Sequence, residues 1–394
     1  MEVKQIYELI NSVSSEVLGK TDLVHEDLAG IVDLGNEILN QKAVDSYVKS
    51  LVNHIGKVVF VNRPYSGKVP SVLMDAWEFG SVLEKISADV PKAEENDTWN
   101  LKDGTEYKQD VFHKPTVSAK FFNSKVTFEV PVSITERQVK ESFSSAEQMN
   151  GFLSMIYSAV EKSMTIKTDA LVMRTINNMI AETLEADKAS FGFVASTNEK
   201  VNYSSASTVR CVNLLKLYND KTKAKITADA AITTPDFIRF AAYTMGLYSD
   251  RLQTISTLFN IGGKERFTPK DVLHTVLLSD FAAAAKIYLY ADTFHEDNVL
   301  LPKAETVASW QATGKDYAFA NVSKIDVKSA SGANVSIGGV LGVMFDRDAL
   351  GVTNLDKRVT TNYNAKAEFF NNYYKFDAGY FNDTNENFVV FFVA

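Results

Sequence analysis

Residues that could carry chemistry are sparse in this sequence and far apart. There are five histidines: His25, His54, His113, His274 and His295. They show no HExxH pattern and no paired spacing of the kind that zinc ligands need. His295 has carboxylates beside it, in FHED, but a solvated loop explains this short charged run more simply. We therefore expect no metal site.

Other catalytic signatures are incomplete. Cys211 is the only cysteine, so no intramolecular disulfide is possible, and VRCVN has no glycine context to mark a nucleophile. IGGKE, at 261–265, lacks the leading glycine spacing and the following Ser or Thr of a phosphate loop, and SIGGVLG is not GxGxxG. The two acids of DRD, at 346–348, are typical of a turn after a strand. The sequence predicts no catalytic or cofactor-binding residues, so we expect a protein that is not an enzyme.

Aromatic side chains interleaved with asparagine are concentrated in NYNAKAEFFNNYYKFDAGYFN, at 362–382. Such side chains stack on sugars or bases in some proteins. The simpler interpretation is that they fill a core and a subunit interface, where aromatic rings supply buried area.

Composition limits the possible partners. The chain has 394 residues, 45% of them hydrophobic and 23% charged, with a net charge of −8. This balance suits a large folded core and opposes long-range attraction to nucleic acid. The basic groups Lys221, Lys223, Lys225 and Lys357, Arg358 are short enough to be solvated loop charge. The first residues lack a signal-peptide pattern and no apolar run is long enough to span a membrane, so we expect a soluble, cytoplasmic chain.

The elements begin with helices. Val3, Ile6, Ile10, Val13 and Val17 form a narrow apolar stripe, and Gly19 is placed to end the helix. A second helix is predicted after Asn40, with its apolar face running from Val44 to Ile55. Strand patterns start at 57, pass through a charged stretch that cannot be core, and resume before 124. Residues 57–135 therefore suggest a long two-stranded hairpin with a polar tip, which is marginal in water by itself.

The strand SKVTFEVPVSI, at 124–134, contains a proline although its alternation is regular. Because proline gives no N–H to a ladder, Pro131 predicts an edge strand or a bulge. An exposed apolar edge invites pairing with another chain. We expect a subunit interface here, at Val126, Phe128, Val130, Pro131 and Val132. On this hypothesis Val130→Lys impairs assembly more than it lowers subunit stability.

Apolar residues at helical spacing predict a helix of some 40 residues from about Ser144 to Leu184, roughly 60 Å long, with a break near Thr165 to Thr168 as an alternative. A shorter helix begins at Thr234 and Pro235. KDVLHTVLLSD predicts a buried strand that leads into an alanine-rich helix, and NFVVFFVA predicts a buried central strand. Helices and strands are segregated more than alternated, which favours an α+β fold over a doubly wound sheet.

This order of elements resembles phage major capsid proteins of the Hong Kong 97 fold, most closely those of small short-tailed phages of Gram-positive hosts. The resemblance is carried by SYVKSLVNHIGKVVF, by VLHTVLLSDFAAAAK and by NAKAEFFNNYYKFDAGYFN with the final FVVFFVA. It implies an N-terminal arm, an extended hairpin loop, a long spine helix, a peripheral domain and an axial domain. The implied boundaries are 1–56 for the arm and helix, 57–135 for the hairpin, 136–256 for the peripheral domain with the spine helix, 257–350 for the axial domain and 351–394 for the return to the peripheral domain.

The resemblance also implies a function: a structural protein that self-assembles, through pentamers and hexamers, into an icosahedral head enclosing double-stranded DNA. It implies a separate scaffolding protein, a portal, location in the virion capsid, assembly in the host cytoplasm, no cofactor and no membrane. A cellular nanocompartment shell of the same fold is one alternative, since fold alone does not decide function. A carbohydrate-binding, tail-associated protein that uses the aromatics of 362–382 is another.

Overall fold

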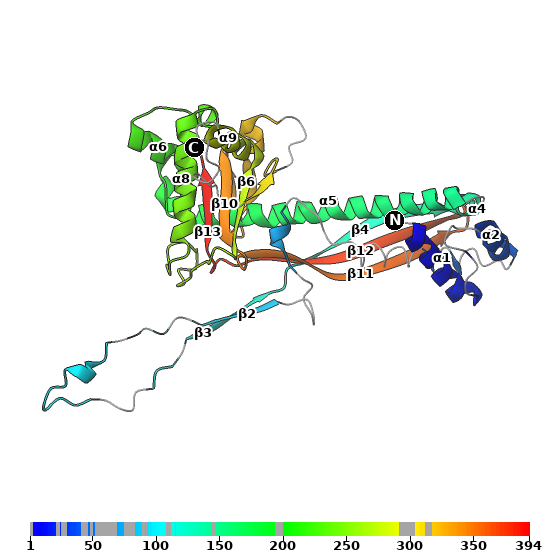
Figure 1. Cartoon of the computed structure of the whole chain (residues 1–394), viewed down its shortest axis with the longest axis horizontal. Helices are drawn as coiled ribbons and strands as arrows, with labels where there is room; N and C mark the ends of the chain where they lie inside the picture. Colours follow the sequence, from blue (N-terminus) through cyan, green and yellow to red (C-terminus); the bar gives the residue numbers. More distant parts are fainter. Residues whose placement is uncertain are drawn as a thin grey trace. The chain divides into compact units, whose positions relative to one another are not determined.

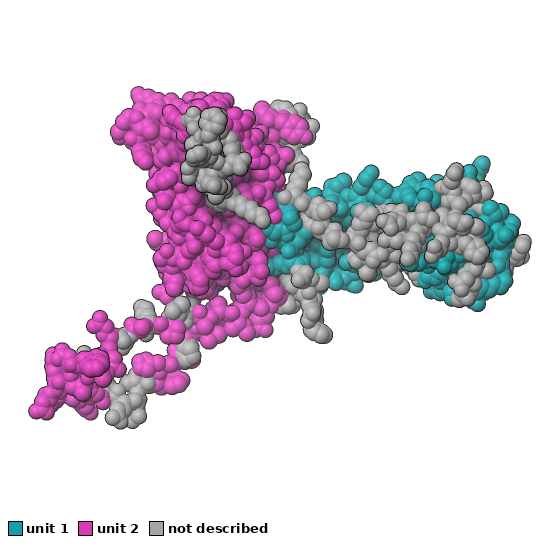
Figure 2. Space-filling model, viewed as in Figure 1, with its two compact units in different colours: residues 1–80, 125–172, 352–379 teal, residues 81–124, 173–351, 380–394 magenta. Residues whose placement is uncertain are grey.

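The structure is a computed structural model, and it divides the chain into two compact units, shown in Figure 2. Unit 1 comprises residues 1–80, 125–172 and 352–379, and unit 2 comprises residues 81–124, 173–351 and 380–394. The structure describes residues 3–20, 24, 30–40, 46–47, 50–51, 69–74, 83–88, 91, 93, 95–107, 112–114, 116–142, 146–193, 200–290, 304–311 and 317–394. The domain boundaries predicted from the resemblance stay a prediction.

Two N-terminal helices belong to unit 1: α1 at Val3–Leu18 and α2 at Ile31–Asn40. The first was predicted, and it ends as expected at Gly19, whose backbone is left-handed (φ +66°) and whose N–H donates to the Ser15 carbonyl. The sequence analysis did not identify α2. The predicted helix from Asn40 to Ile55 and the predicted strand at 57–64 lie largely or wholly outside the described residues.

The sheet of unit 1 has the strand order β1-β11-β12-β4, and three of these strands run side by side along α5 in Figure 1. The strands are β1 at Leu73–Met74, β4 at Lys125–Thr135, β11 at Leu350–Asn364 and β12 at Phe369–Asn382. β4 pairs antiparallel with β12 from Thr135↔Phe369 to Lys125↔Gly379. The apolar side chains of β4 face the core of unit 1, where Val130 and Ile134 are buried.

The long helix α5, Ala146–Ala186, follows the short α4, Glu136–Ser142. The predicted length is confirmed, and the alternative of a break near Thr165 to Thr168 is not observed. Both threonine hydroxyls donate to carbonyls one turn earlier, at Glu161 and Met164, each over 3.0 Å. The side chains are thus satisfied inside the helix, so they do not interrupt it.

The main sheet of unit 2 has five strands in the order β5-β13-β10-β6-β7. They are β5 at Cys211–Asn213, β6 at Leu273–Leu278, β7 at Glu305–Val307, β10 at Val340–Asp346 and β13 at Phe388–Phe392. β13 pairs parallel with β5 and antiparallel with β10, and every residue in it is buried. The C-terminal strand is therefore central, as its uninterrupted apolar run predicted.

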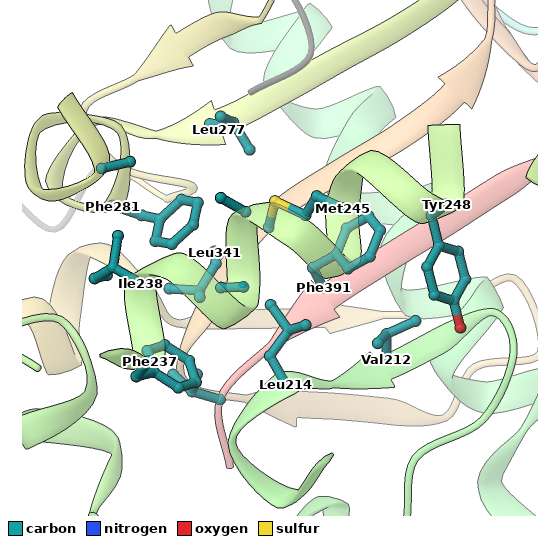
Figure 3. Packing of buried hydrophobic residues seen from close by; sticks show 14 of the residues in the cluster. Val212, Leu214, Phe237, Ile238, Met245, Tyr248, Leu277, Phe281, Leu341 and Phe391 are labelled. Carbon is teal, nitrogen blue, oxygen red and sulfur yellow. The ribbon is translucent and has the colours of Figure 1, made fainter. Parts of the chain in front are cut away.

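The helices of unit 2 are α6 at Leu214–Thr222, α7 at Ala228–Ala231, α8 at Pro235–Arg251, α9 at Ser279–Tyr290 and α10 at Phe319–Val322. α8 starts with Pro235 at its first position, as predicted, and α9 follows β6 directly. Figure 3 shows side chains of α8, such as Phe237 and Met245, packed with those of the sheet, such as Leu341 and Phe391. The same unit contains the small hairpin of β8, Ile325–Lys328, and β9, Asn334–Ile337.

A separate two-stranded hairpin, here called the β2–β3 hairpin, joins β2 at Leu83–Ala88 to β3 at Val117–Phe122. The strand that follows it, β4, pairs with β12 and not with β2. The strand alternation of 124–134 was therefore correct, but its partner is a strand about 240 residues later in the chain. With helices and sheets largely segregated along the chain, the α+β class is confirmed.

Candidate interaction surface

In the described parts of the chain, no three His, Cys, Asp or Glu side chains come together as a metal ion would require. His25, His54 and His295 lie outside the described residues, so the FHED run is not placed. His113 is exposed. His274, on β6, lies against Phe345 with 5.8 Å between ring centroids, and burial lowers its pKa. His274 is half-buried at the start of β6 and belongs to no group of metal-binding side chains among the described residues.

Cys211 is completely buried. Its thiol lies 3.5 Å from the Thr183 carbonyl oxygen. Burial, followed by the nearby Asp187 carboxylate, raises the pKa of Cys211 well above its ordinary value. An activated cysteine needs the opposite shift, because the thiolate is the nucleophile.

The remaining chemical motifs are turns. In IGGKE the Gly262 N–H donates to the Thr384 carbonyl over 2.8 Å, so this backbone is held by the chain itself. In DRD, Asp346 accepts from the Thr268 hydroxyl over 2.8 Å and from the Asp348 N–H over 2.9 Å. The turn predicted at DRD is confirmed, and IGGKE also begins with a turn, at 261–262.

The aromatics of 362–382 fill the core of unit 1 and the end of β12. Phe370, Tyr374, Phe376 and Phe381 are each at most 4% exposed, so they present no face on which a sugar could stack. Tyr363, the most exposed of the set, leans on Phe370 with 4.8 Å between ring centroids. The core interpretation is confirmed.

The short basic groups are placed as ordinary surface charge. Arg358 donates to Asp377 over 2.8 Å and to Asp356 over 3.0 Å, and Lys221 lies over the ring of Phe240. No helix in the described part of the chain has the length and apolar character to cross a bilayer.

The first surface suited to another protein is the open edge of β4. β4 is the last strand in the order of its sheet, so one of its edges meets no strand among the described residues. Pro131, opposite Tyr373 in the ladder, is exposed on that strand. Of the five predicted interface residues, Val130 is buried, and Val126, Phe128 and Val132 are half-buried on the core side. Pro131 and the backbone edge are the parts that face outward.

The second surface is the β2–β3 hairpin, which lies inside the longer segment 57–135 that was predicted to be a hairpin marginal in water by itself. The register pairs Glu84 with Phe121, Ile86 with Ala119 and Ala88 with Val117, which places these side chains on one face. On that face Ile86 is 66%, Phe121 62% and Val117 58% exposed. Three apolar side chains are thus held in solvent on one side of a short ladder.

The tip of the hairpin adds large apolar side chains. Trp99 is 98% exposed, Phe112 86% and Leu101 66%. Single exposed apolar residues are common, but a group of this size on one segment marks an interaction surface. Charge and turn residues in the sequence predicted an exposed tip, but they did not predict its aromatic character.

Comparison with known proteins gives one family match and several similar solved structures. The model of the family described as Phi29-like phage major capsid protein matches residues 10–392. Among solved structures, the chain is similar to the capsid of Staphylococcus phage Andhra at 8% identity, with 84% of this chain and 86% of that chain covered and a TM-score of 0.46. It is also similar to the capsid of Cyanophage P-SCSP1u at 11% identity, with 84% and 89% covered and a TM-score of 0.40. A search of curated proteins gives no significant match.

Proposed function

Since the chain belongs to the Phi29-like phage major capsid protein family, it is a structural protein of a phage capsid, and we propose that its copies close into an icosahedral head through contacts made by the β2–β3 hairpin. The observation that supports this contact is the exposed apolar set on the hairpin, formed by Ile86, Phe121 and Val117 on one face and Trp99 and Phe112 at the tip. Each large side chain of this kind is worth about 1.5–3 kcal/mol when it is moved from water into a contact.

The hairpin is an unusual place for such side chains because it cannot bury them itself. Its strands have six residues each, and a two-stranded ladder of this length is marginal in water. In a closed symmetric shell every copy makes the same contacts with its neighbours. Many contacts that are each modest therefore add up over the whole shell. Covering the hairpin would remove apolar surface from water and stabilise the ladder at the same time.

We propose a second subunit contact along the open edge of β4, at the segment of Val126, Phe128, Val130, Pro131 and Val132. The contact uses the backbone edge, because the valine and phenylalanine side chains face the core of unit 1. Pro131 has no N–H to offer at this edge, so it limits pairing to the intended partner and discourages open-ended strand addition.

The finer organisation follows the resemblance. We propose an N-terminal arm at 1–56, a peripheral domain at 136–256 and 351–394, and an axial domain at 257–350. The hairpin predicted at 57–135 is shorter than that range, because β1 and β4 pair with β11 and β12, and we propose that the β2–β3 hairpin is the extended loop. Pentamers and hexamers of the chain would form the shell, with a separate scaffolding protein and a portal, in the host cytoplasm. The net charge of −8 favours a wall that does not adhere to packaged double-stranded DNA, and the role needs no catalytic step and no cofactor.

The test is a variant that removes the apolar tip without touching a core: Trp99→Ala combined with Phe112→Ser. Both side chains are exposed, so we expect the thermal midpoint of the unassembled subunit to stay within about 2 °C of the wild type. Shell formation, followed by light scattering and electron microscopy, should be lost or reduced at least about tenfold.

The matched control is Tyr317→Ala, which removes an aromatic ring that is 83% exposed in unit 2 but outside the hairpin. It should assemble like the wild type. Normal shells from the Trp99 and Phe112 double variant would contradict the proposed hairpin contact.

A further inference from the structure

Two lysines lie directly opposite each other at the base of the β2–β3 hairpin. The register pairs Lys85 of β2 with Lys120 of β3, on the face away from Ile86 and Phe121. Like charges in directly opposed positions of a ladder destabilise it. A two-stranded hairpin has little else to offset this repulsion, so the pairing needs an anion beside it.

That anion is Asp383, in the loop between β12 and β13. Lys85 Nζ lies 2.9 Å from Asp383 Oδ2, and Lys120 Nζ lies 3.0 Å from Asp383 Oδ1. One carboxylate therefore receives both lysines, one on each oxygen. The Asp383 side chain is 2% exposed and that of Lys85 22%, so this ion pair is shielded from solvent and salt more than a surface pair would be. Lys120, at 37%, is the more exposed partner.

Additional contacts extend this arrangement on both lysines. Lys85 also reaches Glu386 Oε1 at 2.8 Å and donates to the Asp348 carbonyl over 3.2 Å. Lys120 donates to the Thr384 hydroxyl over 3.2 Å. Glu386 is shared with Arg266, whose Nε lies 3.2 Å away. The hairpin is thus fixed to the loop by charge.

The loop that carries Asp383 is itself held on several sides. The Asp383 N–H donates to the Ala349 carbonyl over 2.6 Å, and Asp383 Oδ1 accepts from the Asn385 N–H over 3.0 Å. Asn387 donates from its side chain to the Thr268 hydroxyl over 3.1 Å. Because these hydrogen bonds hold the loop, the Asp383 carboxylate has a defined position to which the hairpin can bind.

The electrostatic surroundings agree with this geometry. Hydrogen bonds and charge from Lys85, together with Lys120, outweigh burial and hold the pKa of Asp383 below its ordinary value. Glu386 and Asp383 raise the pKa of Lys85 despite its burial. Glu182 of α5 also faces Lys120, and burial raises the pKa of that glutamate.

We propose that Asp383 is a positioning residue for assembly, which fixes the base of the β2–β3 hairpin to the β12–β13 loop by neutralising the opposed pair Lys85 and Lys120. Only the effect on assembly rests on the proposed function. The contacts of Asp383 with Lys85 and Lys120, here called the clamp, lie within a single subunit. Phe122 also packs on Phe381 at the same junction, with 5.0 Å between ring centroids. Among the described residues, Asp383 is the carboxylate that contacts both ammonium groups, whereas Glu386 contacts that of Lys85.

The test combines a neutralising variant with a rescue. Asp383→Asn removes the charge, keeps the size and leaves the two lysines opposed. In the unassembled full chain, amide hydrogen exchange in 83–88 and 117–122 should become at least about tenfold faster, and shell formation should fall with it. Adding Lys120→Met to Asp383→Asn removes the repulsion and should return exchange to within about threefold of the wild type. Asp250→Asn, at an exposed pair with Lys270, is the control and should change neither readout.

Each outcome decides a different point. Unchanged exchange in Asp383→Asn would overturn the clamp, whatever the hairpin does in a shell. Faster exchange without rescue by Lys120→Met would also overturn it, since a merely structural role of Asp383 would not respond to removal of a lysine. Faster exchange with normal shells would overturn the positioning role, while the Trp99 and Phe112 variant decides independently whether the hairpin contact exists.

Discussion

At the residue scale, two adjacent glycines, Gly338 and Gly339, differ in what they tolerate. Gly339 has a left-handed backbone (φ +75°), and a Cβ there would lie 2.0 Å from the Val393 carbonyl oxygen. The same carbonyl belongs to the C-terminal end of the chain, where Val393 donates its N–H to the Gly339 carbonyl over 2.8 Å. A Cβ on Gly338 would meet nothing within 4 Å. From the sequence, SIGGVLG could be excluded as a dinucleotide motif, but nothing in it distinguished the two glycines.

We predict that Gly339→Ala lowers the free energy of unfolding by at least about 2 kcal/mol, because the clash is with backbone and the φ is unfavourable for a side chain. Gly338→Ala should change it by less than about 1 kcal/mol. Denaturant unfolding of the two variants measures both values. Equal effects in the two positions would contradict this account of the β9–β10 junction.

A second prediction at this scale concerns pH. The pKa of Asp383 is lowered in the folded chain from its ordinary value of 3.8, chiefly by Lys85. Its contribution to stability is therefore fully present above 3.8 and is lost as the pH falls through the lower, folded pKa. Thermal unfolding at decreasing pH should show a steeper loss for the wild type than for Asp383→Asn. Parallel curves for the two proteins would mean that Asp383 is not paired in solution.

At the element scale, the sequence predicted which segments form helices and strands better than it predicted which strands pair. Periodicity and caps were sufficient for α1, α5, α8 and β13, because each signal lies within its own segment. The alternation of 124–134 predicted the strand β4, but neither its partner β12 nor the packing of its apolar face in the core of unit 1. Alternation contains no information about a strand so distant in the chain. α2 was missed although Ile31, Leu34 and Ile38 have helical spacing, because the segment is short.

The burial of Val130 changes what a charge there is expected to do. Val130 is 7% exposed and packs in the core of unit 1, so Val130→Lys should lower the free energy of unfolding by about 3 kcal/mol or more. The hypothesis drawn from the sequence was that this variant impairs assembly more than it lowers subunit stability. The burial of Val130 instead predicts a direct loss of subunit stability. Ser133→Lys, on the exposed face of the same strand, loses one hydrogen bond to Asn371 and should lose less than about 1 kcal/mol. Similar unfolding midpoints for the two variants would show that β4 does not pack as described.

At the scale of the whole molecule, the order of elements was the informative signal. The match of the Phi29-like capsid family to residues 10–392 confirms the resemblance to phage major capsid proteins. No single motif indicated this function. The histidines, Cys211 and the glycine motifs predicted no catalytic site, so they gave no evidence for an enzyme either. The surfaces were harder to predict than the fold. The exposed faces of the hairpin depend on its register, and its base contacts a carboxylate more than 260 residues away in sequence, at Asp383.

The central claim is that copies of this chain close into a shell, and electron microscopy of the purified, concentrated protein in negative stain tests it most directly. The protein would be imaged alone and with a candidate scaffolding protein. The account predicts closed shells tens of nanometres across in at least one of the two conditions, and their loss in the Trp99→Ala, Phe112→Ser variant. Particles that stay small and monomeric in both conditions would contradict it.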